Sequence, residues 1–539
     1  MVKEKWRPSA LTQPDSQRSL EFDVDRRVRG TAGGDRLESS CPPAQHVASL
    51  PAVTLHLNSV VSTRAFFGTL DLTDFYLGTP LPAPQYIKIY VNSYPPAVLT
   101  RLGLDAFIKH DASGKPYVFF RIEKTMYGLK EAGKLSNLRL VGLLASFGFF
   151  ETTTPGFYRH VSRPISFVLV VDDFGVKYHS KVDFDYLVSC LTTLYQVKSH
   201  PTGTKFLGFT ITHDRTSGTL VVSYPGYIAS LLARLRPHGV PHASSPSIYT
   251  PPSYGSRAPQ SPTGPDASPP ASLDQLKQVQ VAVGYLLYYG RSVDSRILPA
   301  TCALASEQAA PTLDTMRRLD RLLGYVAAHP KGQKVYRASD MVLRVLADAS
   351  YLSCPKAGSV AGPFHFLGMH EPSPVFINHP VSAHSTRIPV VCSFSGEAEY
   401  GGAYAAARIA TEERRILANM GHPQPPTPLY CDNECAIGLA SDTITPKMSK
   451  SIDMRFHWLR DRVRQGQFVI RYVPGLQNIA DFFTKALPVA RHKLLAPYVA
   501  LDDFETLDGL LQAELKLSSL SCAALLTYNS HHAGVLMPP

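Results

Sequence analysis

The most constraining feature of the sequence is an apolar run that ends in two adjacent carboxylates, in the stretch SFVLVVDDFGVKY at 166–178. The run Phe167–Val171 is typical of a covered strand, and we expect a turn at Gly175 to lead into a second β-rich run. Asp172 and Asp173 are thus predicted at or near the tip of a hairpin. Neighbouring carboxylates repel and shift each other's pKa unless a cation neutralises them, and a divalent metal is the simplest one. The alternative is an exposed turn in which both aspartates supply only turn chemistry.

Length and composition limit the class of protein. A chain of 539 residues predicts two or more domains, and 44% hydrophobic with 10% aromatic residues allows globular folding. The formal charge of +11 favours an acidic partner, most commonly nucleic acid, with a membrane surface or simple solubility as alternatives. Neither a signal-peptide core nor a membrane-length apolar run is visible, so we expect a soluble, intracellular chain. Eight cysteines without a CxxC pair indicate reduced thiols.

A segment rich in Pro, Ser and Gly at 241–272 divides the chain, and helical apolar spacing at 273–292 and 311–330 follows it. From about position 343 the pattern becomes mixed α/β, with a final helix expected from NIADFFTKAL at 478–487. We expect these units: an N-terminal tail at 1–20, a first folded unit at 21–235, a linker at 236–272, a helical unit at 273–340, a mixed-sheet domain at 341–490 and a C-terminal tail at 491–539.

A third carboxylate, Asp71, follows a strand-like run in FGTLDLTDFYLGTPL. Three aspartates at strand ends can hold two divalent ions about 4 Å apart, an arrangement that activates a 3′-hydroxyl and stabilises a leaving pyrophosphate. Three features follow one another along the chain: Asp71, KTMYGLKEAG at 124–133 and VVDD at 170–173. The order resembles the reverse transcriptase of copia-type LTR retrotransposons.

The resemblance implies further site residues. RRVRGTAGGDR at 26–36 resembles the fingers segment, so Arg26 and Arg29 are expected to face the triphosphate of the incoming nucleotide; a basic solvated turn is the alternative. Tyr76 resembles the aromatic gate that rejects a ribose 2′-hydroxyl, with a plain core tyrosine as the alternative. TKFLGFTIT at 204–212 resembles the hairpin between palm and thumb.

The segment around the YGL turn is expected to contact nucleic acid through Lys124, Tyr127 and Gly128. Two positions depart from the family pattern. Val170 stands where the family has the tyrosine of its hairpin, and Glu131 stands in the nucleotide-binding segment where a glutamine is usual. A carboxylate beside a nucleotide pocket repels triphosphate unless it is paired, so Glu131 bears on nucleotide affinity.

A second set of carboxylates lies downstream: Asp348, Glu397, Asp432 and Asp481. The expected elements put them at two strand ends and near the starts of two helices, as in the ribonuclease H fold, whose acidic set holds two Mg²⁺ ions. Two segments resemble copia-type RNase H: LYCDNECAIGLA and KSIDMRFHWLRDRVRQGQFVIRYVPGLQNIADFFTK. Glu399 competes with Glu397 for the position on the helix.

The segment DMRFHWLRDRVR predicts an amphipathic basic helix. Its basic side chains are expected to contact the backbone of an RNA/DNA hybrid, and a solvated helix face is the alternative. These side chains are Arg455, His457, Arg460, Arg462 and Arg464.

The resemblance implies an α/β and α+β multidomain fold: a reverse transcriptase at 21–235 with fingers, palm and the start of the thumb, a helical thumb or connection at 273–340, and an RNase H-like mixed-sheet domain at 341–490. The resemblance implies an RNA-directed DNA polymerase with RNase H activity, which uses two Mg²⁺ per site, with Mn²⁺ as the alternative ion. Its expected partners are an RNA template, a DNA primer, RNA/DNA hybrid, dNTPs and other polyprotein products such as capsid and integrase, without a membrane. The expected location is cytoplasmic virus-like particles, the nucleus or both. A catalytically inactive nucleic-acid-binding remnant and an enzyme with RNase H activity alone are the alternatives.

Overall fold

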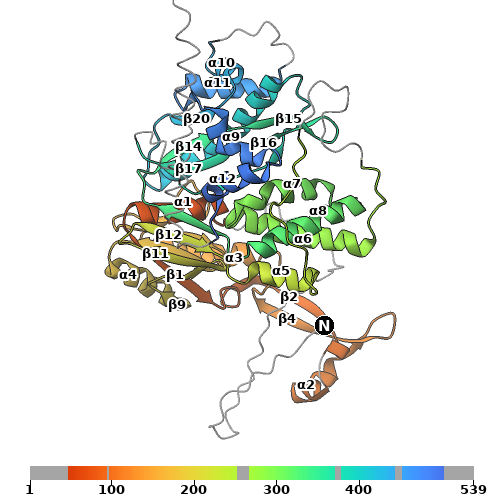
Figure 1. Cartoon of the computed structure of the whole chain (residues 1–539). Coiled ribbons are helices and arrows are strands. Elements are labelled where there is room, and N and C mark those ends of the chain that lie inside the picture. The colour runs from red at the N-terminus through yellow and green to blue at the C-terminus, as the bar shows by residue number, and fades with distance from the viewer. Residues whose placement is uncertain (1–45, 94–95, 252–265, 371–377, 444–451, 503–539) are drawn as a thin grey trace, which may run out of the picture.

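The computed structural model describes residues 46–93, 96–251, 266–370, 378–443 and 452–502, and it is a mixed α/β structure (Figure 1). The expected triphosphate contacts Arg26 and Arg29 lie outside these ranges. Within the described ranges, no helix is long and apolar enough to cross a membrane.

The first unit is a six-stranded sheet in the order β5-β6-β7-β8-β1-β9. Side chains alternate across it: Phe167 and Leu169 of β7 pack with the helices α3 and α4, whereas Val168 packs on the side of α1. Both faces are therefore buried, as the continuous apolar run predicts. The elements are β5 (Phe149–Glu151), β6 (Phe157–His160), β7 (Ile165–Val170), β8 (Asp173–Tyr178), β1 (Phe66–Thr73), β9 (Gln196–His200), α1 (Leu50–Ser62), α3 (Ala132–Ser146) and α4 (Lys181–Thr192).

The hairpin of β7 and β8 differs from the expectation in the position of its turn. The turn comprises Val171 and Asp172, because Val170 pairs with Asp173. The expectation of a turn at Gly175 is wrong, since Gly175 lies inside β8. A Cβ at Gly175 would lie 2.8 Å from the ring of Phe206, so this glycine admits a distant aromatic side chain rather than a turn.

A three-stranded ribbon in the order β2-β4-β3 follows β1 in the chain and extends away from the rest of the molecule (Figure 1). β4 contacts the short helices η2 and η3. The elements are β2 (Pro80–Tyr90), η2 (Val91–Ser93), α2 (Pro96–Arg101), η3 (Leu104–Phe107), β3 (Lys109–His110) and β4 (Pro116–Lys124).

A four-stranded sheet and a group of helices follow. The hairpin expected in 204–212 is present, since Phe206 pairs with Phe209, and the expected helices at 273–292 and 311–330 correspond to α6 and α8. β13 lies beyond these helices in the chain and pairs with β12. The elements are β10 (Lys205–Phe206), β11 (Phe209–Asp214), β12 (Thr219–Ser223), α5 (Tyr227–Leu235), α6 (Leu273–Ser292), η4 (Ser295–Ile297), α7 (Leu298–Glu307), α8 (Leu313–Ala328) and β13 (Gln333–Arg337).

The last unit has a five-stranded sheet in the order β18-β17-β14-β20-β21 and a small sheet in the order β15-β16-β19. β14 and β20 run parallel, as do β20 and β21, so their carboxyl ends meet at one edge. The strands are β14 (Val342–Leu346), β15 (Ala349–Cys354), β16 (Gly358–Ala361), β17 (Phe364–Gly368), β18 (Ser382–Ala383), β19 (Thr386–Arg387), β20 (Thr427–Cys431) and β21 (Phe468–Tyr472).

The helices of this unit are α9 (Ser395–Asn419), α10 (Glu434–Ala440), η6 (Met454–Phe456), α11 (His457–Arg464), η7 (Gly475–Gln477), η8 (Ile479–Phe483) and α12 (Val489–Val499). The single helix expected from position 478 is instead the short helix η8 followed by α12, because Pro488 directly precedes α12 as its cap. α12 lies in the segment that we expected to be a tail, and its Leu495 and Tyr498 are buried.

One hydrophobic core joins these units. α1 contacts β7, β13 and α9, and its apolar residues share a cluster with those of α6, α8 and α9. Polar contacts support the same junction. Ser59 of α1 lies 2.7 Å from Nε2 of His422 and accepts a hydrogen bond of 2.7 Å from Lys177 of β8, and Asn419 of α9 donates one of 2.7 Å to Thr154.

A buried ionic cluster fastens the end of the described chain to the helices. The Arg296 guanidinium donates to Asp294 at 2.8 and 2.7 Å and to Asp502 at 2.6 Å, and Asp502 lies 2.6 Å from His329. We predict that Arg296→Ala lowers the free energy of unfolding by about 3–5 kcal/mol, because it leaves the buried Asp294 carboxylate unpaired. Urea unfolding measures the change.

Lys277→Ala is the matched control, since the side chains of Lys277 and Asp274 are 74% and 91% exposed in their ion pair on α6. It should change the free energy of unfolding by less than about 1 kcal/mol. Equal effects of the two substitutions would contradict the prediction.

Candidate active sites

The first candidate centre lies where the hairpin of β7 and β8 meets β1. Asp71 of β1 stands opposite Asp173, the first residue of β8, and the backbone N–H of Leu72 donates to the carbonyl of Asp172 at 3.3 Å. Val171 in the turn has φ of 61°, a left-handed conformation that is rare for a β-branched residue. The prediction that both adjacent aspartates lie at the hairpin tip is confirmed, and the register brings Asp71 beside them.

Burial and, to a smaller extent, mutual repulsion shift the pKa values of the carboxylates in this centre. Burial raises the pKa of Asp173 to about 6, with smaller contributions from the charges of Asp172 and Asp71. Burial also raises the pKa of Asp172, and the charge of Asp71 adds to it. The one ion pair of Asp71 recorded among the described residues is with the exposed Lys198 of β9, at 3.4 Å. A divalent cation is therefore favoured here, and the donors are carboxylate oxygens, which suit Mg²⁺.

Tyr76 lies close to these aspartates. Its pKa is raised by burial and by the charge of Asp172, and its ring meets that of Tyr127 edge-on at 4.7 Å. The carbonyl of Tyr76 accepts a hydrogen bond from the Thr125 hydroxyl, which fixes the backbone next to the ring. The half-buried ring thus lies between the centre and the hydrophobic core, against which it packs.

The YGL turn lies beside Tyr76. Lys124 ends β4 and is exposed, as are Tyr127 and Gly128, and Gly128 has φ of 97°, which favours glycine. Glu131 directly precedes α3, where it is exposed and its side chain makes no capping hydrogen bond.

The second candidate centre is built at the carboxyl edge of the parallel strands. Asp348 follows β14 and Asp432 follows β20, while Asp481 comes from η8. The Thr484 hydroxyl donates to Oδ2 of Asp348, and Lys485 pairs with Asp481 at 2.5 Å. Three aspartates expected from separate segments are therefore brought to one place.

Glu399 of α9, not Glu397, completes this group. Burial raises the pKa of Glu399 to about 9, with further contributions from the charges of Asp348 and Asp432. Burial likewise raises the pKa of Asp348 to about 7, with the charge of Asp481 next in size. Burial is also the main cause of a raised pKa at Asp432. The four carboxylates thus form one repelling set, which a divalent cation would neutralise.

The expectation for Glu397 needs correction. Its side chain is buried away from the aspartates, where Oε2 accepts from the backbone N–H of Ser393 at 2.6 Å and Oε1 accepts from that of Asp453 at 3.2 Å. Glu397 therefore holds the start of α9 against the loop before η6. Residues two apart on a helix point in different directions, so only one of the two glutamates can face Asp348.

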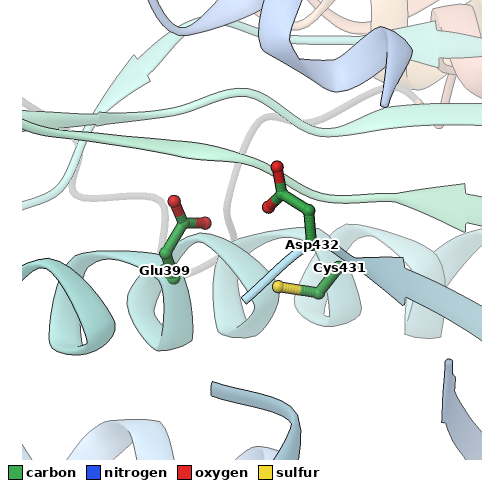
Figure 2. A group of neighbouring side chains, drawn as sticks. All are labelled: Glu399, Cys431 and Asp432. Atoms are coloured by element: carbon green, nitrogen blue, oxygen red, sulfur yellow. The ribbon is translucent and has the colours of Figure 1, made fainter. Parts of the chain in front are cut away.

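Within the described ranges, one group of three ligand atoms has all its members within 4.8 Å of one another: those of Glu399, Cys431 and Asp432. Figure 2 shows the carboxylates of Glu399 and Asp432 pointing the same way. Burial raises the pKa of the Cys431 thiol, so it remains protonated, and thiols do not suit Mg²⁺. Among the described residues, neither the three aspartates of the first centre nor Asp348 and Asp481 of the second belong to such a group.

The basic residues of α11 and η6 are engaged within the protein. Arg455 pairs with Asp453 at 2.8 Å, Arg460 with Asp442 at 3.1 Å, and Arg464 also pairs with Asp442. Arg462 lies over the Trp458 ring at 5.0 Å. Burial and the neighbouring Arg460 lower the pKa of His457, whose ring lies 6.1 Å from that of Tyr400. Their contact with nucleic acid stays a prediction.

Two acidic groups at strand ends of one mixed α/β chain define a protein with two candidate centres for divalent metal ions. The comparisons identify its relatives. The chain is 26% identical over 387 residues to a retrovirus-related Pol polyprotein from transposon RE2 of Arabidopsis thaliana, a match that covers 69% of this chain and 24% of that polyprotein. It is 23% identical to the Pol polyprotein from transposon TNT 1-94 of Nicotiana tabacum, over 72% of this chain and 29% of that one.

A transposon Ty5-1 protein of Saccharomyces cerevisiae is 26% identical over 52% of this chain and 83% of its own length. The resemblance to retrotransposon polyproteins is thereby confirmed, and the chain spans about a quarter of the plant polyproteins that it matches. No protein-family model matches the sequence.

Solved structures that resemble the chain have low TM-scores against it. LC11-RNase H1, isolated from compost, is 13% identical with a TM-score of 0.19, over 27% of this chain and 93% of that one. A foamy viral protease-reverse transcriptase in complex with double-stranded DNA is 14% identical with a TM-score of 0.18, over 78% of this chain and 60% of that one. The assignment as a mixed α/β structure rests on the sheet topology described above.

We predict that Glu399→Gln stabilises the metal-free protein at alkaline pH. A carboxyl whose pKa is raised from 4.5 to about 9 on folding binds more protons in the folded state, so its contribution to stability is lost as pH rises through this range. The melting temperature of Glu399→Gln in EDTA should therefore exceed that of the wild type at pH 8–9, and the two should converge near pH 4. Mg²⁺ should raise the melting temperature of the wild type more than that of the variant.

Glu397→Gln is the matched control. It should lower the melting temperature in EDTA, because it weakens two hydrogen bonds to backbone N–H groups, and it should leave the response to Mg²⁺ intact. A Mg²⁺ response that disappears in Glu397→Gln but persists in Glu399→Gln would overturn the assignment of Glu399.

Proposed function

We propose that this chain is the polymerase and RNase H portion of a copia-type retrotransposon polyprotein: an RNA-directed DNA polymerase that also cuts RNA in a hybrid. The observation that carries the proposal is the presence of two separate carboxylate groups, each at strand ends and each surrounded by its own sheet. The order of the motifs along the chain and the polyprotein relatives support it.

The domain layout follows from this proposal. The six-stranded sheet is the palm, the ribbon of β2, β3 and β4 belongs to the fingers, and α5 to α8 form the thumb and connection. The unit from about 341 to 490 is the RNase H domain. The partners are an RNA or DNA template, a primer, dNTPs and RNA/DNA hybrid, and capsid and integrase products are further ones. Replication would occur in cytoplasmic particles, followed by entry into the nucleus.

In the polymerase centre, Asp71, Asp172 and Asp173 would hold divalent cations, Mg²⁺ or Mn²⁺. Such ions supply charge neutralisation for phosphoryl transfer and acidify the attacking 3′-hydroxyl. The raised pKa of Asp173 keeps this carboxyl protonated at mildly acidic pH, so the centre should become ready for cations only toward neutral pH. Tyr76 would lie against the sugar of the incoming nucleotide, and Lys124, Tyr127 and Gly128 would contact the template and primer. Arg26 and Arg29 would bind the triphosphate, and Glu131 would lower the affinity for it unless it is paired.

In the RNase H centre, Asp348, Glu399, Asp432 and Asp481 would hold the cations that neutralise the scissile phosphate. Lys485 would limit the repulsion at Asp481, and Thr484 would orient Asp348 through its hydroxyl. The arginines of α11 would meet the backbone of the hybrid by exchanging exposed carboxylate partners for phosphates, at a small net cost.

A specific observation favours a second candidate, RNase H activity alone. Val170 and Glu131, which depart from the family pattern, both belong to the polymerase half. An inactive nucleic-acid-binding remnant is the remaining alternative.

Primer extension separates these candidates. Purified protein is assayed on poly(rA)/oligo(dT) with Mg²⁺, together with a labelled RNA/DNA hybrid. We predict that Asp172→Asn reduces extension at least about 100-fold and leaves RNA cleavage intact, because losing a cation ligand removes several kcal/mol of transition-state stabilisation. Glu399→Gln should reduce RNA cleavage and leave primer extension intact.

The outcomes assign the function. Cleavage without extension in the wild type would leave RNase H as the only activity, and neither activity despite hybrid binding would identify a folded remnant. Extension that survives in Asp172→Asn would refute the polymerase centre as described.

A further prediction concerns Tyr76. Replacing it with valine removes the ring that would exclude a 2′-hydroxyl, so the preference for dTTP over UTP should fall at least about tenfold. Tyr76→Phe retains the ring and should retain the preference. Single-nucleotide insertion kinetics measure both ratios, and an unchanged preference in Tyr76→Val would show that Tyr76 only packs.

A further inference from the structure

The outer face of the ribbon carries an ordered set of aromatic and basic side chains. Residues directly opposite each other in an antiparallel pair share a face, and so do alternate residues along a strand. The register of β2 with β4 and of β3 with β4 therefore places one set on a single face. Its pairs are Tyr86 with Arg121, Lys88 with Phe119, Tyr90 with Tyr117 and Lys109 with Tyr117.

This face is open. The side chains of Tyr86 and Phe119 are 66% and 48% exposed, although aromatic side chains of a sheet ordinarily pack in a core. The opposite face is apolar and carries Ile87, Ile89 and the buried Val118. The alternation of side chains along the strands already gives the ribbon one apolar face for packing. The exposed rings on the other face are therefore not needed for the packing of the ribbon.

The cations of this face lie over its rings. Nζ of Lys88 is 3.9 Å from the centroid of the Tyr117 ring and 4.9 Å from that of Tyr90, and Nζ of Lys109 is 5.8 Å from that of Phe119. A ring flanked by a cation offers a stacking surface beside a phosphate contact.

Two acidic groups reduce the charge of the face. Arg121 pairs with Glu123 at 3.2 Å, and Lys88 lies 4.0 Å from Asp111. The side chains of Arg121 and Glu123 are both largely exposed, and exposed ion pairs contribute little, so a phosphate can replace the carboxylate. Lys109 has no carboxylate partner recorded among the described residues. The face therefore stays attractive to a polyanion.

The spacing favours a single strand of nucleic acid. Successive pairs on one face of a ribbon lie about 6.8 Å apart, which is about twice the 3.4 Å per nucleotide of a duplex strand. An unstacked strand can thus offer a base to each ring, whereas bases inside a duplex cannot reach the rings. A second copy of this chain is disfavoured, because the same face would bring Lys88, Lys109 and Arg121 against their own charges.

We propose that this face of the ribbon binds single-stranded RNA or DNA with little sequence preference, by stacking of bases on Tyr86, Phe119 and Tyr117 and by phosphate contacts of Lys88, Lys109 and Arg121. The face lies on the ribbon and not among the carboxylates: Tyr86 pairs with Arg121, which lies three residues, or about 10 Å, from Lys124 along β4. Binding there does not depend on either catalytic activity.

The test measures binding of the full chain to fluorescein-labelled dT and rU 12-mers by anisotropy, in EDTA. Tyr86→Ala and Phe119→Ala should each weaken binding about 5- to 100-fold, and Tyr86→Phe should retain the affinity. Phe150→Ala is the matched control, since Phe150 is 51% exposed on β5 of the other sheet, and it should leave the affinity unchanged. Circular dichroism and melting temperature confirm that each variant is folded.

Charge is tested by salt dependence. Lys88→Gln and Arg121→Gln should each lower the slope of log affinity against log salt by about 0.7, while Lys181→Gln, an exposed lysine of α4, should not. An unchanged affinity in both alanine variants, or equal losses for a 12-base-pair duplex, would overturn the proposal. Self-association in sedimentation that disappears in Tyr86→Ala, without a loss of oligonucleotide binding, would assign the face to a second copy instead. Because EDTA removes cations from both carboxylate centres, these results are independent of the extension and cleavage assays.

Discussion

Carboxylates that are buried together at strand ends repel one another, and both candidate centres are organised around that repulsion. In each centre one lysine pairs with one carboxylate, Lys198 with Asp71 and Lys485 with Asp481, and the other carboxylates have no ion pair recorded among the described residues. Burial is the main cause of the raised pKa values of Asp173 and Glu399, and the charges of the neighbouring carboxylates raise them further. The surrounding sheets hold these groups in place, so a cation relieves the repulsion without any need to order a loop.

The same packing that holds each centre also joins the two. α9 carries Glu399 near its start. At its end, Asn419 donates a hydrogen bond to Thr154, which lies between β5 and β6, and the following His422 lies 2.7 Å from Ser59 of α1. α1 fills the space between the units, and its neighbour Lys177 belongs to the strand that begins with Asp173. The two centres therefore share one hydrophobic core, and we expect them to keep a fixed separation along a bound nucleic acid.

Local signals predicted much of the fold. The helix expected at 273–292 is α6 in full, because Ser272 and Gln275 form a capping box before an amphipathic repeat. Local sequence patterns gave wrong predictions where contacts with a segment distant in the sequence determine the structure. Gly175 suggested a turn, yet it serves the approach of Phe206 from β10, and the pairing of β13 with β12 leaves no local trace. The aspartates at strand ends were predictable because a buried run followed by a carboxylate is a local pattern.

The small residues that follow the two glutamates of α9 distinguish them. Glu399 is followed at helical spacing by small residues, Gly402 and Ala406, that lie on the side of the sheet, whereas Glu397 is followed by Gly401, which faces Phe456. A Cβ at Gly402 would lie 2.9 Å from the carbonyl oxygen of Asp348, so this glycine lets α9 approach the end of β14. Glu399, on the same side of the helix as Gly402, is thereby brought to Asp348, whereas Glu397, two residues earlier, points away. The small residues, more than the glutamates themselves, carry the information about which carboxylate belongs to the centre.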